Sequence, residues 1–455
     1  MAEPKKHIVV LGASYAGLST AHYVLKHVLP RLPDSGGYDV VLVSASAEAM
    51  CRPACPRALI ADRFFPQDKL FVGVAAQFAA YPPGQFRFVH GRATALDRRG
   101  RTVAVALSSS KPENTSTETE TIPFHALVIA TGASTPSPLL GLNDGPSDTL
   151  RAHWAAFRTA LPAARSIVIA GGGPAGVEVA GELGEHLNGS SGGGGGGWKA
   201  WWPLGSSKPP PRVAITLVTS APELLPALPP AIARAAEAQL ARLGVRVVKN
   251  TRVTAVSFTP SPSPSSKNST SDLDPDPLTS HAAVTLASGA ILHADLYIPC
   301  VGTTPNTAFL AGSDSDSSSS ELLTADGRVA TDPSTLRISS AQPGERLYAV
   351  GDASDYARRP AVHAVLAAVP VLCANLRRDL LLPLVGEGKG QEGDDAVFRE
   401  DTRATQLVPL GTRTGVGAVM GYRLPGFAVW LIKGRDYWLW TTGRLWSGRQ
   451  WAKES

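Results

Sequence analysis

Two glycine-rich turns in this chain have the residues and the spacing to hold the pyrophosphate of a dinucleotide. Residues 171–176 read GGGPAG and satisfy G-x-G-x-x-G, whereas residues 12–17 read GASYAG, with Ser14 in place of the middle glycine. The first glycine makes the turn, the second lets the backbone approach the pyrophosphate, and the third lets the helix pack closely on the strand. Serine is small, its hydroxyl could donate to phosphate, and the helix N-terminus attracts the anion. The second turn predicts a dinucleotide site, and the first is a less specific signal.

The strands that end beside these turns do not distinguish NADH from NADPH. An acidic residue at the end of the second strand would bind the ribose 2′-hydroxyl, and an arginine would accommodate a 2′-phosphate. Ser44 stands at that position in the first unit, with Glu48 four residues later, and Thr219 and Ser220 stand there in the second. The preference between NADH and NADPH therefore stays open.

Three further apolar runs lead into turns of small residues. They read LVIATG at 127–132, DLYIPCVG at 295–302 and RLYAVGD at 346–352. The second run continues to TPN at 304–306 and falls at the place in the second unit that the first run has in the first unit. The third run puts Asp352 directly after a strand and a glycine, where the alternative is an N-cap of the following helix.

Each glycine turn must be positioned by a strand before it and a helix after it. A short apolar run, a helical pattern and a second apolar run surround each turn, at 7–11, 18–25 and 40–43 in the first unit and at 166–170, 177–187 and 213–218 in the second. Continuous apolar runs are typical of parallel strands buried on both faces. Two such βαβ openings predict two nucleotide-binding units, because one dinucleotide site would not need both.

Composition is that of a globular protein. The chain has 455 residues, 44% of them apolar and 18% charged, with a formal net charge of +5. This apolar content is ample for a core, and no nucleic-acid-binding pattern accompanies the mild positive charge, so no nucleic-acid partner is expected. Five biased tracts without an apolar period predict surface loops, at 108–121, 188–211, 259–279, 313–320 and 386–395.

Cysteine usage and hydropathy indicate the compartment. Four cysteines do not make a disulfide scaffold, so we expect an intracellular protein, with the cytoplasm as the default.

No His, Cys or carboxylate cluster has metal-ligand spacing, so no metal is expected. The best candidate for a membrane span, 361–376, is interrupted by His363 and Asn375 and is shorter than the roughly 20 residues required, so we expect no transmembrane helix.

In this order and at this spacing, GASYAG, ATG, GGGPAGVE, VGTTPN and YAVGD resemble the motifs of the two-dinucleotide-binding-domain flavoproteins, the pyridine nucleotide-disulfide oxidoreductase superfamily. Pro56-Arg57 and the tail VPLGTRTGVGAVMGYRLPGFAVWLIKGRDYW are similar to its apoptosis-inducing-factor-like branch, of the AMID or ferroptosis-suppressor type, which is also close to type II NADH dehydrogenases. The resemblance implies an α/β fold of two doubly wound Rossmann-like dinucleotide-binding domains and a small α+β C-terminal domain.

The flavin's GD motif returns after the second unit, which implies that the NAD(P)H-binding domain is inserted in the FAD-binding domain. The expected boundaries are 1–150 for the first part of the FAD-binding domain, 151–312 for the NAD(P)H-binding domain with its low-complexity insertions, 321–385 for the second part of the FAD-binding domain, and 396–455 for the C-terminal domain.

The resemblance also assigns cofactor-binding residues. On the FAD side they are Gly12, Ser14, Ala16, Gly17, Arg57, Thr131, Gly132, Gly351 and Asp352. On the NAD(P)H side they are Gly171, Gly173, Ala175, Gly176, Glu178 and Gly302. Asp352 would accept hydrogen bonds from the ribityl hydroxyls, and Arg57 would lie against the cofactor, with a surface ion pair as its alternative. Glu178, near the nicotinamide, is the one catalytic candidate; its alternative is a carboxylate that only stabilises the helix N-terminus. His363 lines the flavin edge or is structural.

The family implies an FAD-dependent NAD(P)H oxidoreductase, which passes a hydride from NAD(P)H to FAD and electrons on to an acceptor, with a quinone expected. One alternative is a redox-sensing regulatory flavoprotein with little turnover. Another is a disulfide reductase that uses Cys51 and Cys55. Their C-x-x-x-C spacing departs from the C-x-x-x-x-C of disulfide reductases, and two nearby prolines disfavour a regular helix. The remaining interpretation of these cysteines is packing under the flavin.

The C-terminal tail is rich in aromatic and basic residues. It holds five of the nine tryptophans, namely Trp430, Trp438, Trp440, Trp446 and Trp451. From Lys433 onward it has five Lys/Arg and two acidic residues. Such a tail could seat the protein peripherally on a membrane surface. The alternative is that the tryptophans pack the C-terminal domain or a homodimer contact, and the run at 437–440 looks like a buried strand.

Overall fold

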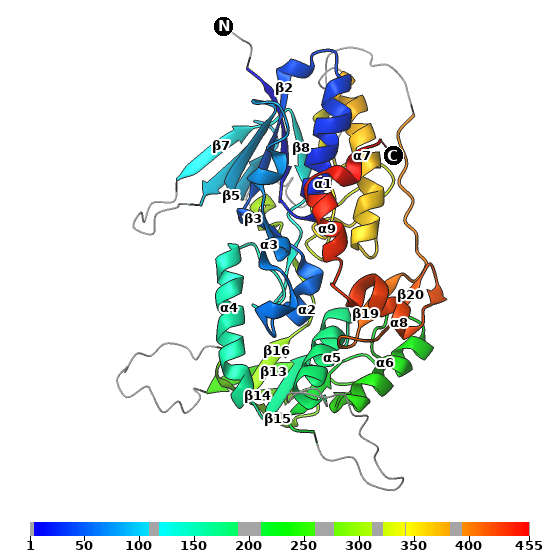
Figure 1. Cartoon of the computed structure of the whole chain (residues 1–455). Coiled ribbons are helices and arrows are strands. Elements are labelled where there is room, and N and C mark those ends of the chain that lie inside the picture. The colour runs from blue at the N-terminus through cyan, green and yellow to red at the C-terminus, as the bar shows by residue number, and fades with distance from the viewer. Residues whose placement is uncertain are drawn as a thin grey trace.

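The computed structural model describes residues 4–108, 118–189, 211–259, 277–311, 322–341, 343–382 and 394–454. Of the five tracts predicted as surface loops, 313–320 lies wholly outside the described residues and the other four lie mostly outside them. Two sheets, one above the other in Figure 1, form the body of the molecule, and a smaller C-terminal unit lies beside them. The central strands of both sheets are parallel.

The upper sheet in Figure 1 contains the predicted FAD-side turn. Its strand order is β18-β8-β1-β2-β5-β6-β7. The bounds are β1 Lys6–Leu11, β2 Tyr38–Ser44, β5 Phe86–Asp97, β6 Thr102–Leu107, β7 Thr119–Pro123, β8 Ala126–Ile129 and β18 Leu347–Ala349. The strands from β18 to β5 pair in parallel, and β5, β6 and β7 continue antiparallel. The central strands are continuous apolar runs because both faces of the sheet are covered.

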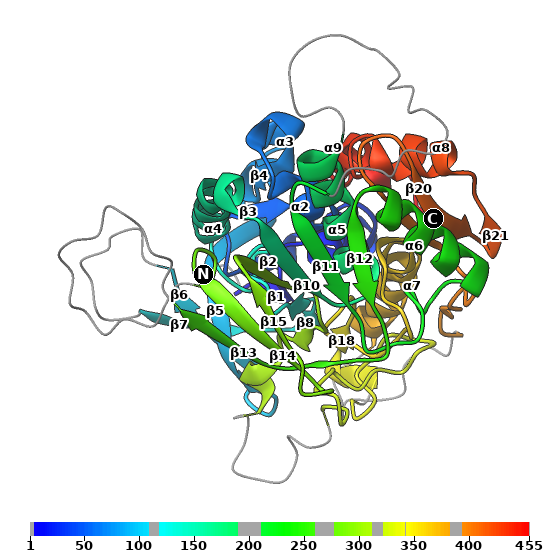
Figure 2. The same ribbon diagram turned by 90° about the horizontal axis from the view of Figure 1, so that it is seen from below.

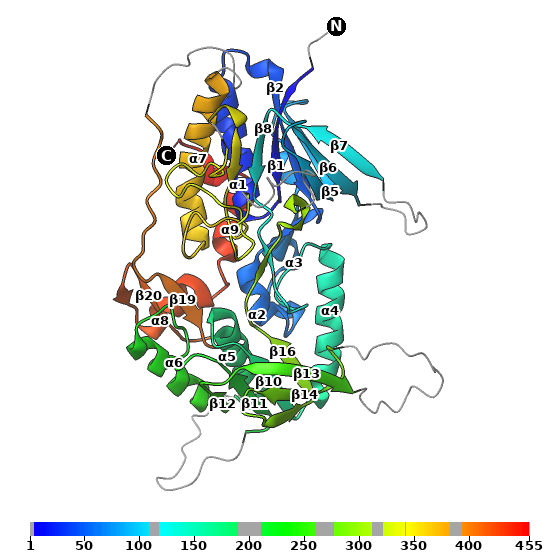
Figure 3. The same ribbon diagram turned by 180° about the vertical axis from the view of Figure 1, so that it is seen from behind.

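Helices cover one face of this sheet, as Figure 3 shows from behind. The long ones are α1 (Tyr15–Tyr23) and α7 (Val362–Leu381), which pack against each other. Below the sheet, the short strands β3 (Glu48–Met50) and β4 (Phe71–Gly73) pair antiparallel. The segment between them contains α2 (Cys55–Ala58) and α3 (Gln67–Leu70).

The lower sheet contains the predicted NAD(P)H-side turn. Its parallel order is β12-β11-β10-β16, with bounds β10 Ser166–Ala170, β11 Ala214–Val218, β12 Val245–Val248 and β16 Leu296–Pro299. Helices α5 (Pro174–Asn188) and α6 (Pro230–Arg242) share an apolar core with one face. The other face packs on an antiparallel sheet, seen from below in Figure 2, of β13 (Val253–Thr259), β14 (His281–Leu286) and β15 (Ile291–Ala294).

The chain passes between the two sheets twice, and the two passages pair with each other. They form the ribbon of β9 (Ala133–Ser134) and β17 (Thr304–Pro305). Helix α4 (Ser147–Ala160) follows the outward passage, and β18 rejoins the upper sheet after the return. The second unit is therefore inserted in the first, which confirms the predicted α/β fold. The domain boundaries themselves stay predictions.

The C-terminal unit touches both of the others. Its antiparallel strands are β19 (Gln406–Pro409), β20 (Gly415–Val419) and β21 (Tyr422–Arg423). They are followed by α8 (Gly426–Val429), which continues as a π-helix over Trp430–Gly434, and by α9 (Leu439–Trp446). Strands β19 and β20 pack on α5 and α6, whereas α9 packs on α1. The unit thus bridges the two sheets.

The buried strand predicted at 437–440 is wrong. Tyr437 and Trp438 form a turn with positive φ, 52° and 74°, and α9 begins at the next residue. Tyr437 is buried because it packs on charged side chains from other elements and not because it joins a sheet. Trp446 and Trp451 are buried against α1 of the first unit, so these two tryptophans pack neither within the C-terminal unit nor on an exposed surface. No helix among the described residues has the length and hydropathy to span a membrane.

Candidate functional site

The FAD-side turn connects β1 to α1, and two of its positions leave no room for a side chain. Gly12 has a φ of +103°, and a Cβ there would lie 2.3 Å from the carbonyl oxygen of Ala130. A Cβ on Gly17 would lie 1.7 Å from the carbonyl oxygen of Gly12. Ser14 differs from both. It is exposed, its backbone is extended with φ −117°, and its side chain makes no capping hydrogen bond to α1. Its hydroxyl is therefore available to a ligand.

The NAD(P)H-side turn connects β10 to α5 in the same way. Gly171 has a φ of +120°, and a Cβ there would lie 2.2 Å from the carbonyl oxygen of Cys300. A Cβ on Gly176 would lie 1.9 Å from the carbonyl oxygen of Gly171. Gly173 has φ −75°, and a Cβ there would meet nothing within 4 Å. Ala175 is half-buried and packs on the apolar core. The turn presents an open backbone at its middle position.

The carboxyl ends of the two sheets meet at the β9–β17 ribbon. Thr131 donates from Oγ1 to the carbonyl oxygen of Asn306 over 2.8 Å, and Asn306 returns a bond from Nδ2 to the carbonyl oxygen of Thr131 over 3.0 Å. The Asn306 N–H also donates to the carbonyl oxygen of Gly132 over 2.9 Å. A Cβ on Gly132 or Gly302 would meet nothing within 4 Å. Two of the predicted segments are therefore joined, with open space beside both glycines.

Asp352 and Gly351 lie where β18 ends beside α1. A Cβ on Gly351, whose φ is +86°, would lie 3.2 Å from the Cβ of Ala16. The Asp352 carboxylate is half-buried, and this burial raises its pKa. Arg52 was not predicted, yet its Nη1 lies 3.8 Å from Asp352 Oδ2 and donates to the carbonyl oxygen of Ala133 over 3.0 Å. Arg52 therefore links the GD motif to the ribbon between the sheets.

Arg57 is buried among protein acceptors, and its predicted place against FAD stays a prediction. Its side chain is only 4% exposed, and Nε and Nη2 donate to the two carboxylate oxygens of Glu182 over 2.9 and 2.8 Å. Nη1 donates to the carbonyl oxygen of Gly434 over 2.6 Å, and Nη2 also donates to that of Gly411 over 3.1 Å. Because every guanidinium nitrogen already has a protein acceptor, the residue joins α2 to α5 and the C-terminal unit. The ion pair is buried, unlike the predicted surface pair.

Glu178 lies in the first turns of α5 and is buried. Its Oε1 accepts a hydrogen bond from Lys433 Nζ over 2.5 Å, and the same ammonium donates to the carbonyl oxygen of Leu407 over 3.1 Å. Burial raises the pKa of Glu178 to about 7, and Lys433 offsets part of that rise. The carboxyl can therefore hold a proton near neutral pH. Its place beside the nicotinamide stays a prediction.

Three carboxylates on one face of α5 bind the C-terminal unit. Glu178, Glu182 and Glu185 are spaced four and three residues apart, which puts them on one side of a helix. Glu182 Oε1 accepts from the Tyr437 hydroxyl over 2.8 Å, and Glu185 Oε2 accepts from the backbone N–H of Thr412 over 2.6 Å. This acidic face was not predicted, although the spacing of the acidic residues in GVEVAGELGEHL indicates it.

Cys51 and Cys55 lie in an environment that disfavours the thiolate form. Cys51 and Cys55 are free and buried. Burial raises the pKa of Cys51 to about 11 and raises that of Cys55 even further above its usual range. Cys51 donates from Sγ to the carbonyl oxygen of Tyr437 over 3.3 Å and accepts from the Tyr15 hydroxyl over 3.5 Å. Since the thiolate is the reactive species, this environment favours packing over disulfide chemistry.

The remaining observations concern His363 and possible metal ligands. His363 is exposed on the first turn of α7, with the charge of Asp401 nearby, so it is not a buried structural histidine. Across the described ranges, no three His, Cys, Asp or Glu side chains are gathered as they would be around a metal ion.

The residues present fit two dinucleotides. In both turns the middle residue, Ser14 or Gly173, leaves the backbone accessible in front of a helix N-terminus. Gly132 and Gly302 leave room for a ligand where the two sheets meet. This class of protein is a two-site dinucleotide-binding flavoprotein. The family model described as pyridine nucleotide-disulphide oxidoreductase matches residues 6–368, so the chain belongs to that family. It is a pyridine nucleotide-dependent flavoprotein oxidoreductase with FAD and NAD(P)H as its cofactors.

Two fungal relatives are similar along the chain. Oxidoreductase phnG of Penicillium herquei is 54% identical over 454 residues, which cover 100% of this chain and 99% of the relative. Oxidoreductase ptaL of Pestalotiopsis fici is 28% identical over 435 residues, which cover 94% and 95% of the two chains.

Solved structures share the fold at low identity. Reduced CoADR-RHD of Bacillus anthracis has a TM-score of 0.56 at 17% identity, covering 83% of this chain; the match spans 57% of the length of that protein. The water-forming NADH oxidase of Lactobacillus brevis bound to NADH has a TM-score of 0.54 at 16% identity, covering 82% of this chain and 69% of the oxidase. These likenesses support the fold alone.

Proposed function

We propose that this chain is an FAD-dependent NAD(P)H oxidoreductase of the apoptosis-inducing-factor-like branch that delivers electrons to a quinone-like acceptor. The observation that carries the proposal is the burial of Cys51 and Cys55 with raised thiol pKa values. Without a reactive dithiol, electrons would pass from bound FAD to the acceptor with no thiol between them. A quinone takes up two electrons and two protons without any thiol intermediate, and it is therefore the acceptor class that suits this site.

The chain's own residues bind, orient and supply protons. When bound, FAD supplies the electron transfer between NAD(P)H and the acceptor. The turns at Gly12 and Gly171 would hold the two pyrophosphates on helix N-termini, and Asp352 would accept hydrogen bonds from ribityl hydroxyls. The Glu178 carboxyl can hold a proton near neutral pH, because its pKa is raised to about 7. Lys433 Nζ fixes that carboxyl and keeps a positive charge beside it.

The tail supports assignment to the apoptosis-inducing-factor-like branch. Lys433 lies within the tail segment whose sequence resembles that branch, and it pairs with the Glu178 carboxylate that follows the NAD(P)H turn. Tyr437, from the same segment, binds Glu182. The tail therefore contributes to the interior beside α5 and is more than a surface extension.

The test is an anaerobic reaction of the flavin-loaded protein with NADH or NADPH, followed by a pulse of acceptor. Menadione, a soluble quinone, is expected to restore the oxidised flavin spectrum rapidly, whereas glutathione disulfide is not. The double variant Cys51→Ser/Cys55→Ser is expected to keep quinone turnover. Reoxidation by the disulfide that is lost in this variant would establish a disulfide reductase instead. A reduced complex that menadione fails to reoxidise would establish the redox-sensing alternative.

A further inference from the structure

Exposed apolar side chains gather in one part of the C-terminal unit. Nine large hydrophobic side chains are exposed among the described residues, and five of them lie between residues 420 and 440. These five define the C-terminal patch: Met420 (51% exposed), Tyr422 (76%), Phe427 (68%), Leu431 (51%) and Trp440 (57%). Such a concentration on a surface marks an interaction site more often than scattered exposure does.

The patch is built on connected elements at the edge of the molecule, where α8 and β20 lie in Figure 1. Phe427 and Leu431 are four residues apart on α8 and the π-helix that continues it, so they project from one side of that helical stretch. Trp440 Nε1 donates to the carbonyl oxygen of Ile432 over 3.4 Å, which holds its ring beside the end of the same stretch. Tyr422 lies on β21, just before α8.

The net positive charge of the chain comes from the sequence segment that contains this patch. Residues 411–449 contain six Lys/Arg and a single acidic residue, Asp436. The whole chain has 43 Lys/Arg and 38 Asp/Glu, so the remainder is balanced at 37 of each. Of the six, Lys433 is half-buried, and the exposed ones are Arg413, Arg423, Arg435, Arg444 and Arg449. The formal net charge of +5 therefore belongs to this segment.

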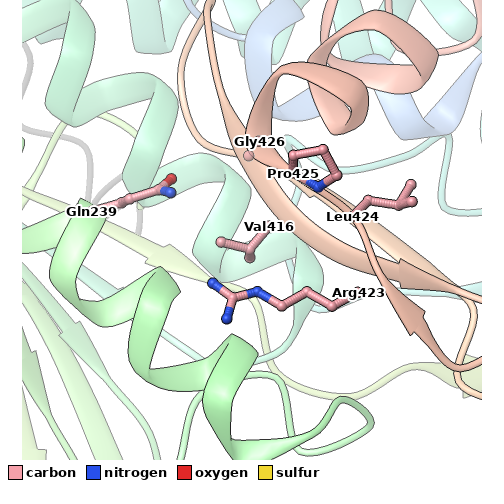
Figure 4. A pocket seen from close by; sticks show the side chains of 7 residues that line it. Gln239, Val416, Arg423, Leu424, Pro425 and Gly426 are labelled. Carbon is pink, nitrogen blue, oxygen red and sulfur yellow. The ribbon is translucent and has the colours of Figure 1, made fainter.

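The exposed arginines are not used inside the protein. Within the ranges that the structure describes, only Arg435 has an ionic neighbour, with Nη2 4.0 Å from Asp436 Oδ2. Arg423 instead lines a hollow between α6 and the β20–α8 segment, where Figure 4 shows its guanidinium extended toward the helix that carries Gln239. Gln239 Oε1 is buried there without a hydrogen-bond partner in the described part of the chain. A cationic hollow thus adjoins the apolar patch.

We infer that the C-terminal patch docks the protein on an anionic membrane surface. Aromatic and aliphatic side chains enter the boundary between head groups and acyl chains, while neighbouring arginines attract anionic lipids. A second copy of this chain is the weaker occupant, because a two-fold contact would place the same unpaired arginines against each other. The inference is independent of the proposed electron acceptor, since it concerns only the patch and its charge.

Vesicle binding by the full-length, flavin-loaded protein tests this inference. Phosphatidylcholine vesicles with and without phosphatidylserine are separated by flotation, and the bound protein is measured. We expect binding that requires phosphatidylserine and weakens with added sodium chloride, since salt screens the attraction. No binding to phosphatidylserine vesicles at low salt would overturn the inference, whatever the catalytic activity of the same sample.

Matched variants locate the contact. Phe427→Ser and Leu431→Ser are expected to abolish most of the binding, whereas Ile291→Ser on β15, equally surface-exposed at 54%, is expected to leave it unchanged. Arg423→Gln should lower the partition coefficient roughly five-fold, the effect of one positive charge near an anionic surface. Equal loss in Phe427→Ser and Ile291→Ser would contradict the assignment. So would a dimer, detected by light scattering without vesicles, that Phe427→Ser dissociates.

Discussion

The two glycine turns differ at one of their three key positions, and the backbone shows why that position can change. Gly12 and Gly171 both have positive φ, +103° and +120°. At the middle position, Ser14 and Gly173 both have φ in the negative, extended region, −117° and −75°. An L-residue with a side chain adopts the second conformation freely but is strained in the first. The turns are therefore equivalent in the backbone although they differ in sequence.

The comparison separates two physical origins of the G-x-G-x-x-G pattern. The first and third glycines are imposed by the protein itself, because a Cβ at Gly17 or Gly176 would lie 1.7 or 1.9 Å from a carbonyl oxygen of the same turn. The middle residue is limited only by the approach of the ligand, since a Cβ at Gly173 meets no protein atom within 4 Å. Ser14 is thus compatible with a working FAD site.

The helices that follow the turns differ more than the turns do. Helix α1 has no acidic residue and packs on the sheet, α7 and α9. Helix α5 carries Glu178, Glu182 and Glu185 on a face that binds the C-terminal unit. Both helices therefore contact the C-terminal unit, but only α5 binds it through acidic side chains, and the predictions below test that asymmetry first.

The largest expected effect comes from breaking the link between the two halves at Arg57. Arg57→Ala should lower the free energy of unfolding by about 3–5 kcal/mol, because it leaves the buried Glu182 carboxylate without its charge partner. Urea denaturation measures this. Arg87→Ala, which removes an exposed pair with Glu120, is the control and should cost less than about 1 kcal/mol. Equal losses in the two variants would show that the buried link is not structural.

Glu178 should make stability depend on pH in a direction opposite to that of an ordinary paired carboxylate. Its pKa in the folded protein is raised to about 7, so the folded state binds the proton more tightly than the unfolded chain does. This contribution is complete below about pH 4.5 and is lost as the pH rises through about 7.

The variant Glu178→Gln has a neutral side chain at every pH of the experiment. Relative to wild type, it should therefore gain up to about 3 kcal/mol in unfolding free energy between about pH 5 and about pH 8.5. Urea denaturation at the two pH values gives the difference. A constant difference between variant and wild type would mean that Glu178 titrates alike in the folded and unfolded states.

Adding a methyl group to the third glycine should separate the two sites. Gly17→Ala and Gly176→Ala each force a shift of the helix against its turn, at a cost of about 1–3 kcal/mol. Gly17→Ala should weaken FAD retention about ten-fold or more, whereas Gly176→Ala should keep FAD and raise the KM for NAD(P)H by a similar factor. Flavin content after dialysis and steady-state kinetics report the two effects. Loss of FAD from Gly176→Ala would contradict the separate assignment of the turns.

The smallest effect is expected at the middle position. Gly173→Ser gives the second turn the serine that the first turn has at position 14. The backbone at residue 173 is extended, and a Cβ there meets no protein atom within 4 Å. Its KM for NAD(P)H should stay within about three-fold of the wild-type value, since less than about 1 kcal/mol of strain is added. An effect as large as that of Gly176→Ala would show that the pyrophosphate leaves no room for the side chain.

Sequence alone could predict what depends on neighbours along the chain. The strand-turn-helix units, the insertion of one unit in the other and the positions of Thr131, Gly132 and Asp352 follow from local patterns and their order. The partners of Arg57 and Glu178 do not, because Glu182, Gly434 and Lys433 come from distant segments that only tertiary packing brings together. Arg52 was overlooked beside Arg57 for the same reason. The tail was misread because buried aromatic residues in a turn and in a strand look alike in sequence.

The central claim is that electrons reach and leave the flavin without a protein dithiol, and the stoichiometry of reduction tests it most directly. The purified, flavin-loaded protein is titrated anaerobically with NADH or NADPH while the flavin absorbance is followed. The account predicts complete reduction by one equivalent of the reduced nucleotide per FAD, because Cys51 and Cys55 are free thiols in buried sites and take up no electrons. A requirement for two equivalents, reduced to one in Cys51→Ser/Cys55→Ser, would contradict it.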